Sequence, residues 1–294
     1  MKLLSTKKMN FLFFVCALSA CKKENNIPEI GNITASSNKI AVGQYIILKS
    51  TTTQGAEMDR GLTYNWTGTD GFQSAEPEAR WIPSKNGSQA ITLTLSSGKK
   101  STSKSMSFNV VEPNFRLGLW GNTRSEIQLY ELKAGNKSTS PNEEAMLYAG
   151  ENSTAFDGYI MNNNILNGAA TIYTARYSTN YVQYVNDYNY YLSKLIAKYG
   201  TPKTNLIYYK TEAIRDEIRA YPNRLGETIV NGDASLQATW TIADADIAIV
   251  IYKNETSGNL TFGTAYTPAL GKTTAALENK AQAALEKLTK VLNN

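Results

Sequence analysis

Between residues 28 and 112, apolar and polar residues alternate in short runs. This period of two restricts the fold more than any other feature of the chain. The runs are Ile40–Lys49, Leu62–Trp66, Ala90–Leu95 and Ser105–Val111, and turn dipeptides such as Asp70-Gly71, Asn86-Gly87 and Ser97-Gly98 separate them. No 3.6-residue period occurs there, so we expect strands and no helix. Several short strands over about 85 residues predict an all-β sandwich.

The segment Tyr64–Phe72 (YNWTGTDGF) makes this prediction more specific. It resembles the Tyr-x-Trp…Gly-Phe segment of polycystic-kidney-disease-like (PKD-like) and related immunoglobulin-like (Ig-like) domains of bacterial surface proteins. The resemblance covers residues 28–112. It implies that Trp66 is buried in an Ig-like sandwich that spaces or presents other domains. Thr67-Gly68-Thr69 departs from the Asp-Phe-Gly of many members, which leaves the subfamily open. An alternative is that Trp66 or Trp81 stacks on a sugar.

Residues 113–267 mix helical and strand patterns and therefore predict an α+β domain, with Glu112-Pro113-Asn114 as the joint. Thr123 and Glu126 have the spacing of a capping box, which predicts a helix over Arg124–Glu131. A clear helical period covers Asn180–Tyr199, and Gly200 and Pro202 follow it as stop signals.

Strand patterns fill the rest of this domain. They cover Ala145–Ala149, Tyr159–Met161, Ala169–Ala175, Leu206–Tyr209, Leu236–Ile242, Asp246–Tyr252 and Leu260–Tyr266, with a turn at Asn162–Asn164. Two descriptions fit this order. One is an internal duplication of an α-β-β-β unit whose second copy has an insertion at Thr211–Asp233. The other is an α+β domain without a repeat.

Residues 268–294 predict a C-terminal amphipathic helix. Its apolar stripe consists of Leu277, Ala281, Ala284, Leu285, Leu288, Val291 and Leu292. The stripe either docks on its own domain or pairs with a partner chain. It contains no aromatic residue, which argues against a role at a membrane surface.

The N-terminus has the layout of a secretory signal peptide over residues 1–20. Lys2, Lys7 and Lys8 precede a short apolar stretch, Met9–Leu18. That stretch is well below the roughly 20 residues that cross a bilayer. The following Leu18-Ser19-Ala20-Cys21 resembles the lipobox of bacterial lipoproteins. This resemblance implies that Cys21 becomes the acylated N-terminus, carrying diacylglycerol and an amide-linked chain such as palmitate.

Lipidation at Cys21 has two consequences for the mature chain. Residues 21–27 become a lipidated tether, and the outer membrane, at its surface or its periplasmic face, is the predicted location. The net charge of the whole chain is +5, and removal of residues 1–20 takes away three lysines and no acid, which leaves +2. A charge this small argues against a nucleic-acid partner.

The residue types restrict the chemistry that is available. The chain has no histidine, and its two cysteines, Cys16 and Cys21, are removed or alkylated. Ser-His-Asp and Cys-His catalysis, redox cysteines and imidazole metal sites are therefore excluded. No phosphate-binding loop or calcium-binding loop occurs, so we predict neither a cofactor nor a metal.

Carboxylate pairs and tyrosines are the remaining candidates for a site. Glu212 with Asp216 is interpreted as a solvated helix face with Arg215 and Arg219, and turn chemistry explains Asp244 and Asp246. Of the 18 tyrosines, Tyr181, Tyr184 and Tyr188 follow the apolar stripe of the long helix. Tyr177 and Tyr190 fall off that stripe and are the candidate ligand-contacting aromatics.

The sequence thus predicts a lipid-anchored envelope protein with a binding or structural role and no catalytic residues. On this view the sandwich is a spacer, and the α+β domain recognises a glycan or an envelope protein. Two alternatives stay open. One is a carbohydrate-active enzyme that uses carboxylates, and the other is an envelope assembly factor that docks through its C-terminal helix.

Overall fold

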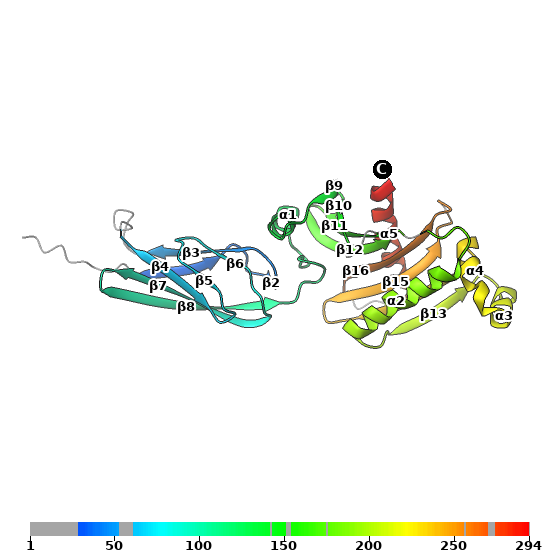
Figure 1. The fold of residues 1–294 in the computed structure, drawn as a ribbon, viewed down its shortest axis with the longest axis horizontal. Coiled ribbons are helices and arrows are strands. Elements are labelled where there is room, and N and C mark those ends of the chain that lie inside the picture. Colours follow the sequence, from blue (N-terminus) through cyan, green and yellow to red (C-terminus); the bar gives the residue numbers. More distant parts are fainter. Residues whose placement is uncertain are drawn as a thin grey trace, which may run out of the picture.

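The computed structural model describes residues 29–52, 61–141, 143–150, 154–174, 176–255, 257–269 and 274–293. These residues form three β-sheets and five α-helices, and most of the regular structure is strand. Figure 1 shows two small sheets at one end of the molecule and a large sheet with its helices at the other.

The two small sheets share one hydrophobic core. The three-stranded sheet has the order β1 (Ile30–Ala35), β3 (Ile46–Thr52), β6 (Ala79–Trp81). The five-stranded sheet has the order β2 (Ile40–Ala41), β8 (Lys100–Val111), β7 (Gly87–Ser97), β4 (Thr63–Gly68), β5 (Gln73–Ser74). Alternate residues of both sheets, among them Leu48, Trp66 and Leu93, are fully buried in this core.

Both tryptophans of this region are core residues. Trp66 and Trp81 have 0% of their surface exposed. Trp66 Nε1 donates to the carbonyl of Glu76 over 2.9 Å, and Trp81 Nε1 donates to Asp70 Oδ2 over 2.9 Å. Because neither ring face reaches solvent, the alternative that these tryptophans stack on a sugar is wrong.

The large sheet has eight antiparallel strands. Its order is β13 (Thr204–Tyr209), β14 (Ala234–Thr241), β15 (Ala245–Lys253), β16 (Leu260–Pro268), β12 (Ile165–Tyr173), β11 (Ala155–Asn162), β10 (Ala145–Ala149), β9 (Ser138–Pro141). The predicted turn between β11 and β12 is confirmed. Asn163 and Asn164 have φ angles of 50° and 62°, the left-handed pair that a two-residue hairpin prefers.

Two helices precede the two halves of this sheet in the sequence. α1 (Arg124–Lys133) begins with the predicted capping box, in which Thr123 and Glu126 bond to each other's backbone N–H. α2 (Val182–Tyr199) ends at Gly200, as predicted, and buries Tyr184, Tyr188, Leu192 and Leu195. The segment predicted as an insertion contains α3 (Glu212–Ala220), a 3₁₀ turn (Pro222–Arg224) and α4 (Leu225–Asn231).

Helices cover both faces of the large sheet. Along β15, Ile247, Ile249 and Ile251 belong to the cluster that contains α2 and α4, whereas Ala248 and Val250 belong to the cluster that contains α5 (Thr274–Asn293). Since neighbouring strand residues point to opposite faces, α2 and α4 lie on one face and α5 lies on the other.

The C-terminal stripe is buried against the chain's own sheet. Ala281, Ala284, Leu285, Leu288 and Val291 are all buried on strands β10, β12, β15 and β16. The side chain of Leu277 lies outside the described residues. The interpretation that this stripe pairs with a partner chain is therefore wrong for the described part of the helix, because the sheet already covers it.

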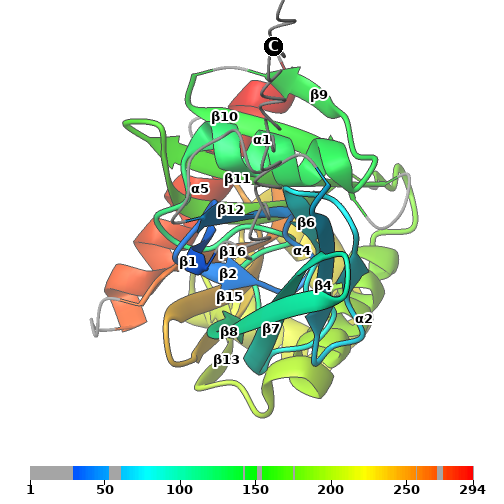
Figure 2. The ribbon, with the colours of Figure 1, turned by 90° about the vertical axis from the view of Figure 1, so that its left-hand side faces the viewer.

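Buried polar contacts join the small sheets to the segment that leads from β8 to α1. Gln44 is fully buried, and its Nε2 donates to the carbonyl of Leu117 over 2.7 Å and to Asn122 Oδ1 over 3.2 Å. The ammonium group of Lys133 on α1 lies 5.2 Å from the ring centroid of Tyr45. Figure 2 shows α1 above the small sheets, which face the viewer.

Candidate functional site

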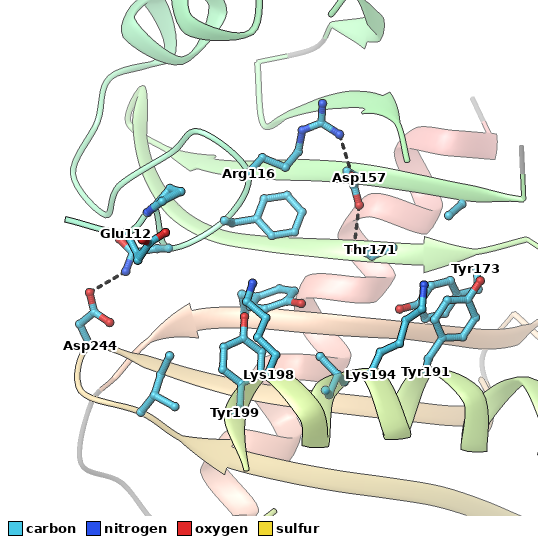
Figure 3. A pocket seen from close by; sticks show the side chains of 17 residues that line it. Glu112, Arg116, Asp157, Thr171, Tyr173, Tyr191, Lys194, Lys198, Tyr199 and Asp244 are labelled. Carbon is cyan, nitrogen blue, oxygen red and sulfur yellow. Dashed lines mark hydrogen bonds and ion pairs between the residues drawn. The ribbon is translucent and has the colours of Figure 1, made fainter. Parts of the chain in front are cut away.

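A cleft of about 740 Å³ opens on the α2 face of the large sheet. Its floor is formed by β11, β12 and β16, one wall by α2, and the other wall by the segment 112–116 that leads out of β8 (Figure 3). This volume falls in the usual range for ligand sites, roughly 300–1,000 Å³. The cleft therefore lies where the two halves of the sheet meet.

The helical wall combines aromatic rings and cations. Tyr191, Lys194, Leu195, Lys198 and Tyr199 line it and recur at steps of three and four residues. This spacing places them on one side of α2. In Figure 3 the side chains of Lys194 and Lys198 extend from α2 toward the floor of the cleft.

Two stacked tyrosines stand at one end of the cleft. The rings of Tyr173 on β12 and Tyr191 on α2 are 3.8 Å apart at the centroids, with an interplanar angle of 16°. The hydroxyl of Tyr173 lies 3.1 Å from Thr264 Oγ1. Tyr173 is only 8% exposed, so the half-buried Tyr191 supplies the accessible part of the pair, an aromatic ring with a polar tip of the kind that recognises sugars and other polar rings.

A carboxylate is held at the centre of the floor. Asp157 and Thr171 are cross-strand neighbours on β11 and β12, and Thr171 Oγ1 donates to Asp157 Oδ1 over 2.7 Å. The other oxygen, Oδ2, accepts from Arg116 Nη1 over 2.7 Å. Both oxygens of Asp157 are thus held in fixed directions.

Arg116 connects this floor to a buried acid. Its Nε and Nη2 donate to the two oxygens of Glu131 over 2.9 and 3.0 Å, and the Glu131 side chain is completely buried. Burial lowers the pKa of Arg116, but the hydrogen bonds and charges of Glu131 and Asp157 outweigh it and raise that pKa overall. Arg116 therefore stays charged and clamps the segment 112–116 to the sheet.

Tyr159 completes this buried network. Its hydroxyl donates to Glu131 Oε1 over 2.5 Å and accepts from the backbone N–H of Leu117 over 3.1 Å. Burial and the neighbouring Glu131 charge raise the pKa of Tyr159 well above its ordinary value. The phenol remains protonated, as its hydrogen bond to the carboxylate requires.

The opposite end of the cleft is closed by Asp244. Asn114 Nδ2 donates to Asp244 Oδ2 over 2.6 Å, and Trp120 Nε1 donates to the Asp244 carbonyl over 2.9 Å. Glu112 also lines this end. Turn chemistry alone therefore does not account for Asp244, because its side chain forms part of the cleft. Its neighbour Asp246 is buried.

The structure separates the two predicted ligand-contacting tyrosines from the lining. Tyr177 is half-buried and donates to Asp187 Oδ2 over 2.5 Å. Tyr190 is 54% exposed and lies 5.1 Å from Tyr191, with Lys194 Nζ 4.8 Å from its ring centroid. Neither is among the described residues that line the cleft. The predicted lipidation residue, Cys21, lies outside the described residues.

The acidic pair on α3 lies on the surface, as predicted. Arg215 Nη2 lies 3.4 Å from Glu212, and Arg219 Nη1 lies 3.5 Å from Asp216. All four side chains are more than a third exposed, so this is a solvated ion-pair network.

Sequence reasoning missed Tyr191, Lys194, Lys198, Arg116 and Asp157. The first three could have been found from the sequence, since they share one side of a helix that its periodicity predicts. No local sequence pattern indicated Arg116 or Asp157, because the residues that they bond to lie on α1 and β12.

The cleft combines charged and aromatic side chains. Within the described ranges, no three side chains of the metal-binding types are grouped to hold an ion. The cleft lining combines three carboxylates with three cations and four tyrosines, a mixture suited to hydroxyl-rich ligands. Among the helices described, none is both long enough and apolar enough to cross a membrane.

Comparisons with known proteins add no family. No family model matches the chain, and no curated protein matches it. The apo structure of Bacteroides uniformis β-glucuronidase 3 is similar at 12% identity and a TM-score of 0.22, over 47% of this chain and 16% of that one. A quinonprotein alcohol dehydrogenase-like protein from Bacteroides thetaiotaomicron aligns at 10% identity and a TM-score of 0.23, over 80% of this chain and 72% of that one. Similarities this weak support neither a fold family nor an activity.

Proposed function

We propose that the chain is a lipid-anchored protein of the bacterial cell envelope, held at the outer membrane, that binds a glycan in the cleft without cleaving it. The observation that carries the proposal is the cleft lining, in which the stacked Tyr173 and Tyr191 lie beside Lys194 and Lys198. Such a surface offers an apolar face to a sugar ring and charged donors to its oxygens.

The N-terminal sheets serve as a spacer in this proposal. They share one core around Trp66, which fits a PKD-like, Ig-like sandwich, and in the sequence they lie between the predicted tether and the residues of the cleft. Gln44 and Asn122 join them to the second region through buried hydrogen bonds. A spacer joined to the second region in this way would carry the cleft away from the membrane.

The second region fits a duplicated unit. In each half a helix precedes four strands in the sequence, one strand more than in the predicted α-β-β-β unit. The last strands of the halves, β12 and β16, pair with each other. The cleft lies above this seam. A site at the seam between two related units would take its lining from both, as this cleft does.

The membrane anchor rests on the sequence Leu18-Ser19-Ala20-Cys21 after a short apolar stretch. Two or three acyl chains on one residue anchor a protein durably, whereas one does not. The absence of histidine and of any cysteine after Cys21 agrees with a role in binding.

A binding screen tests the proposed function. The chain from residue 21, with Cys21→Ser, is applied to neutral and acidic oligosaccharides. We expect saturable binding that Tyr191→Ala weakens at least about tenfold, because aromatic platforms dominate such sites. Tyr221→Ala is the matched control, since this tyrosine at the end of α3 is 60% exposed and does not line the cleft, and its effect should stay below about threefold. Thermal unfolding of each variant separates lost binding from lost structure.

A carboxylate-dependent glycosidase is the second candidate. The specific observation is that Glu112, Asp157 and Asp244 line the same cleft. Both oxygens of Asp157 already accept hydrogen bonds, and Asn114 donates to Asp244. These bonds favour carboxylates that hold a ligand as hydrogen-bond acceptors over carboxylates that react with it. Product analysis of the same protein–oligosaccharide mixtures distinguishes the binding protein from the glycosidase. Cleavage that Asp157→Asn or Asp244→Asn abolishes would establish the enzyme.

A further inference from the structure

β13 is an exposed edge strand of unusual composition. It is the outermost strand of the large sheet and pairs only with β14 in the described part of the chain. Its three central residues, Leu206, Ile207 and Tyr208, are large and apolar, and 44%, 43% and 40% of their surfaces are exposed. Since neighbouring residues point to opposite faces, apolar surface is exposed on both sides of the strand.

The register identifies the backbone groups that face outward. The N–H of Lys210 donates to the carbonyl of Asp233 on the β14 side over 2.8 Å, which makes these two a hydrogen-bonded pair. Antiparallel pairing alternates, so Tyr208, Leu206 and Thr204 also direct their main-chain groups toward β14. The N–H and C=O groups of Asn205, Ile207 and Tyr209 therefore point away from the sheet.

The other edges of the described sheets are short, end in proline or expose no large apolar side chain. β1, at the edge of the three-stranded sheet, has six residues (IGNITA) without proline or charge, but its Ile30 and Ile33 are buried. β9, at the far side of the same sheet, has four residues and ends in Pro141. β2 and β5, at the edges of the five-stranded sheet, have two residues each. β13 has six residues (TNLIYY), with no proline and no charge. Natural sheets use short strands, proline and charge to block edge pairing, so an edge of this kind indicates a partner strand.

We propose that a second copy of this chain pairs with β13, strand to strand and antiparallel, about a two-fold axis at Ile207. This interface goes beyond the proposed function and does not depend on it. The outward-facing N–H and C=O groups of Ile207 fix the position of this axis. With the axis at Ile207, both groups bond to the main chain of Ile207 of the partner subunit. Asn205 and Tyr209 exchange theirs in the same register.

Side-chain complementarity favours a second copy over a different protein. In this register Leu206 lies opposite Tyr208 of the partner subunit, and Ile207 lies opposite its own copy. The exposed apolar residues of one strand therefore cover those of the other. Lys203 and Lys210 fall opposite threonines of the partner strand, so no like charges meet. Two large sheets would join into one continuous sheet.

A cysteine cross-link tests the register directly. The chain from residue 21 with Cys21→Ser has no cysteine, so any disulfide that forms must involve the single introduced thiol. Ile207→Cys should form a disulfide dimer under mild oxidation, because hydrogen-bonded pairs have Cα atoms about 5.5 Å apart, within disulfide range. Ile196→Cys on α2 is the matched control. Ile196 is 40% exposed against 43% for Ile207, and its variant should stay monomeric.

Sedimentation equilibrium supplies the second readout. We expect a dimer whose dissociation constant rises at least about tenfold in Ile207→Lys, since like charges then face each other across the axis. Circular dichroism checks that this edge variant remains folded. A monomer at all concentrations with no Ile207→Cys disulfide would overturn the proposal. So would a dimer that neither variant affects, because it would use another surface.

Discussion

The guanidinium of Arg116 donates to the carboxylate of Asp157 over 2.7 Å, and this contact joins the connecting segment to the floor of the cleft. The same guanidinium forms a bidentate pair with Glu131, whose side chain is completely buried. The Arg116 side chain thus connects the segment 112–116 in the cleft wall to Asp157 in the floor and to Glu131 on α1. The shape of the cleft depends on it.

Replacing Arg116 with methionine should strongly destabilise the protein. Arg116→Met leaves the buried Glu131 without its cation, and breaking a buried pair typically costs about 3–5 kcal/mol. Chemical denaturation of the whole chain measures the loss. Arg215→Met removes a solvent-exposed pair and should cost less than about 1 kcal/mol.

A second variant separates lost charge pairing from lost packing. Adding Glu131→Gln to Arg116→Met removes the unpaired buried charge, so part of the stability should return. Equal losses in Arg116→Met and Arg215→Met, or no recovery in the double variant, would contradict this account of the network.

The docking of the C-terminal helix can be tested at Gly158. A Cβ at this position would lie 2.6 Å from the Cδ atoms of the buried Leu288 on α5, so Gly158→Ala requires that side chain or the helix to shift. We expect it to cost about 1–3 kcal/mol. Leu288→Ala should make room for the new methyl, so the double variant should lose less than the sum of the two single variants. Additive losses in urea unfolding would show that the helix is not packed there.

Tyr130 makes stability depend on pH at alkaline values. The residue is 3% exposed, and burial, with a smaller contribution from Glu126, raises its pKa to about 12. The folded state therefore holds this proton above pH 10, where the unfolded chain releases it, and the residue's stabilising contribution declines as the pH rises from 10 to 12.

The matched variant is Tyr130→Phe, which cannot titrate. The stability difference between wild type and this variant should be constant from pH 7 to 9. Above pH 10 it should decline by at most about 1.4 kcal/mol per pH unit. Urea unfolding at each pH measures it. A difference that stays constant up to pH 11 would refute the raised pKa.

Cys21→Ser tests the anchor in cells. We expect the wild-type chain in the membrane pellet and the variant in the soluble fraction, because the thiol that takes the lipid is gone. Protease added to intact cells then distinguishes the surface from the periplasmic face. If the variant pellets with the membrane as the wild type does, the lipobox interpretation is wrong.

The long, strongly patterned elements could be predicted from the sequence. α2 and the capping box of α1 were found because their local spacing matches their structure. β6 and β9 were missed because they have only three and four residues, too few for a period to show. α3 was anticipated only as the helix face that carries Glu212 and Asp216, and α4 was missed because it has only seven residues.

The cleft could not be predicted because its residues come together only through the sheet topology. Asp157, Lys198 and Asp244 are far apart in sequence, and no local pattern links them. Tyr190 was predicted to contact a ligand, but its neighbour Tyr191 is the residue that lines the cleft. One position on a helix turns a side chain by about 100°, which separates the exposed face from the cleft wall.

The most direct test of the central claim is a long incubation of the chain from residue 21, with Cys21→Ser, with the oligosaccharide that it binds best. Calorimetry measures the complex, and mass spectrometry then measures the length of the sugar. The account predicts one-site binding that Tyr191→Ala weakens and a sugar recovered intact. Binding that is insensitive to Tyr191→Ala, or a sugar recovered in pieces, would contradict it.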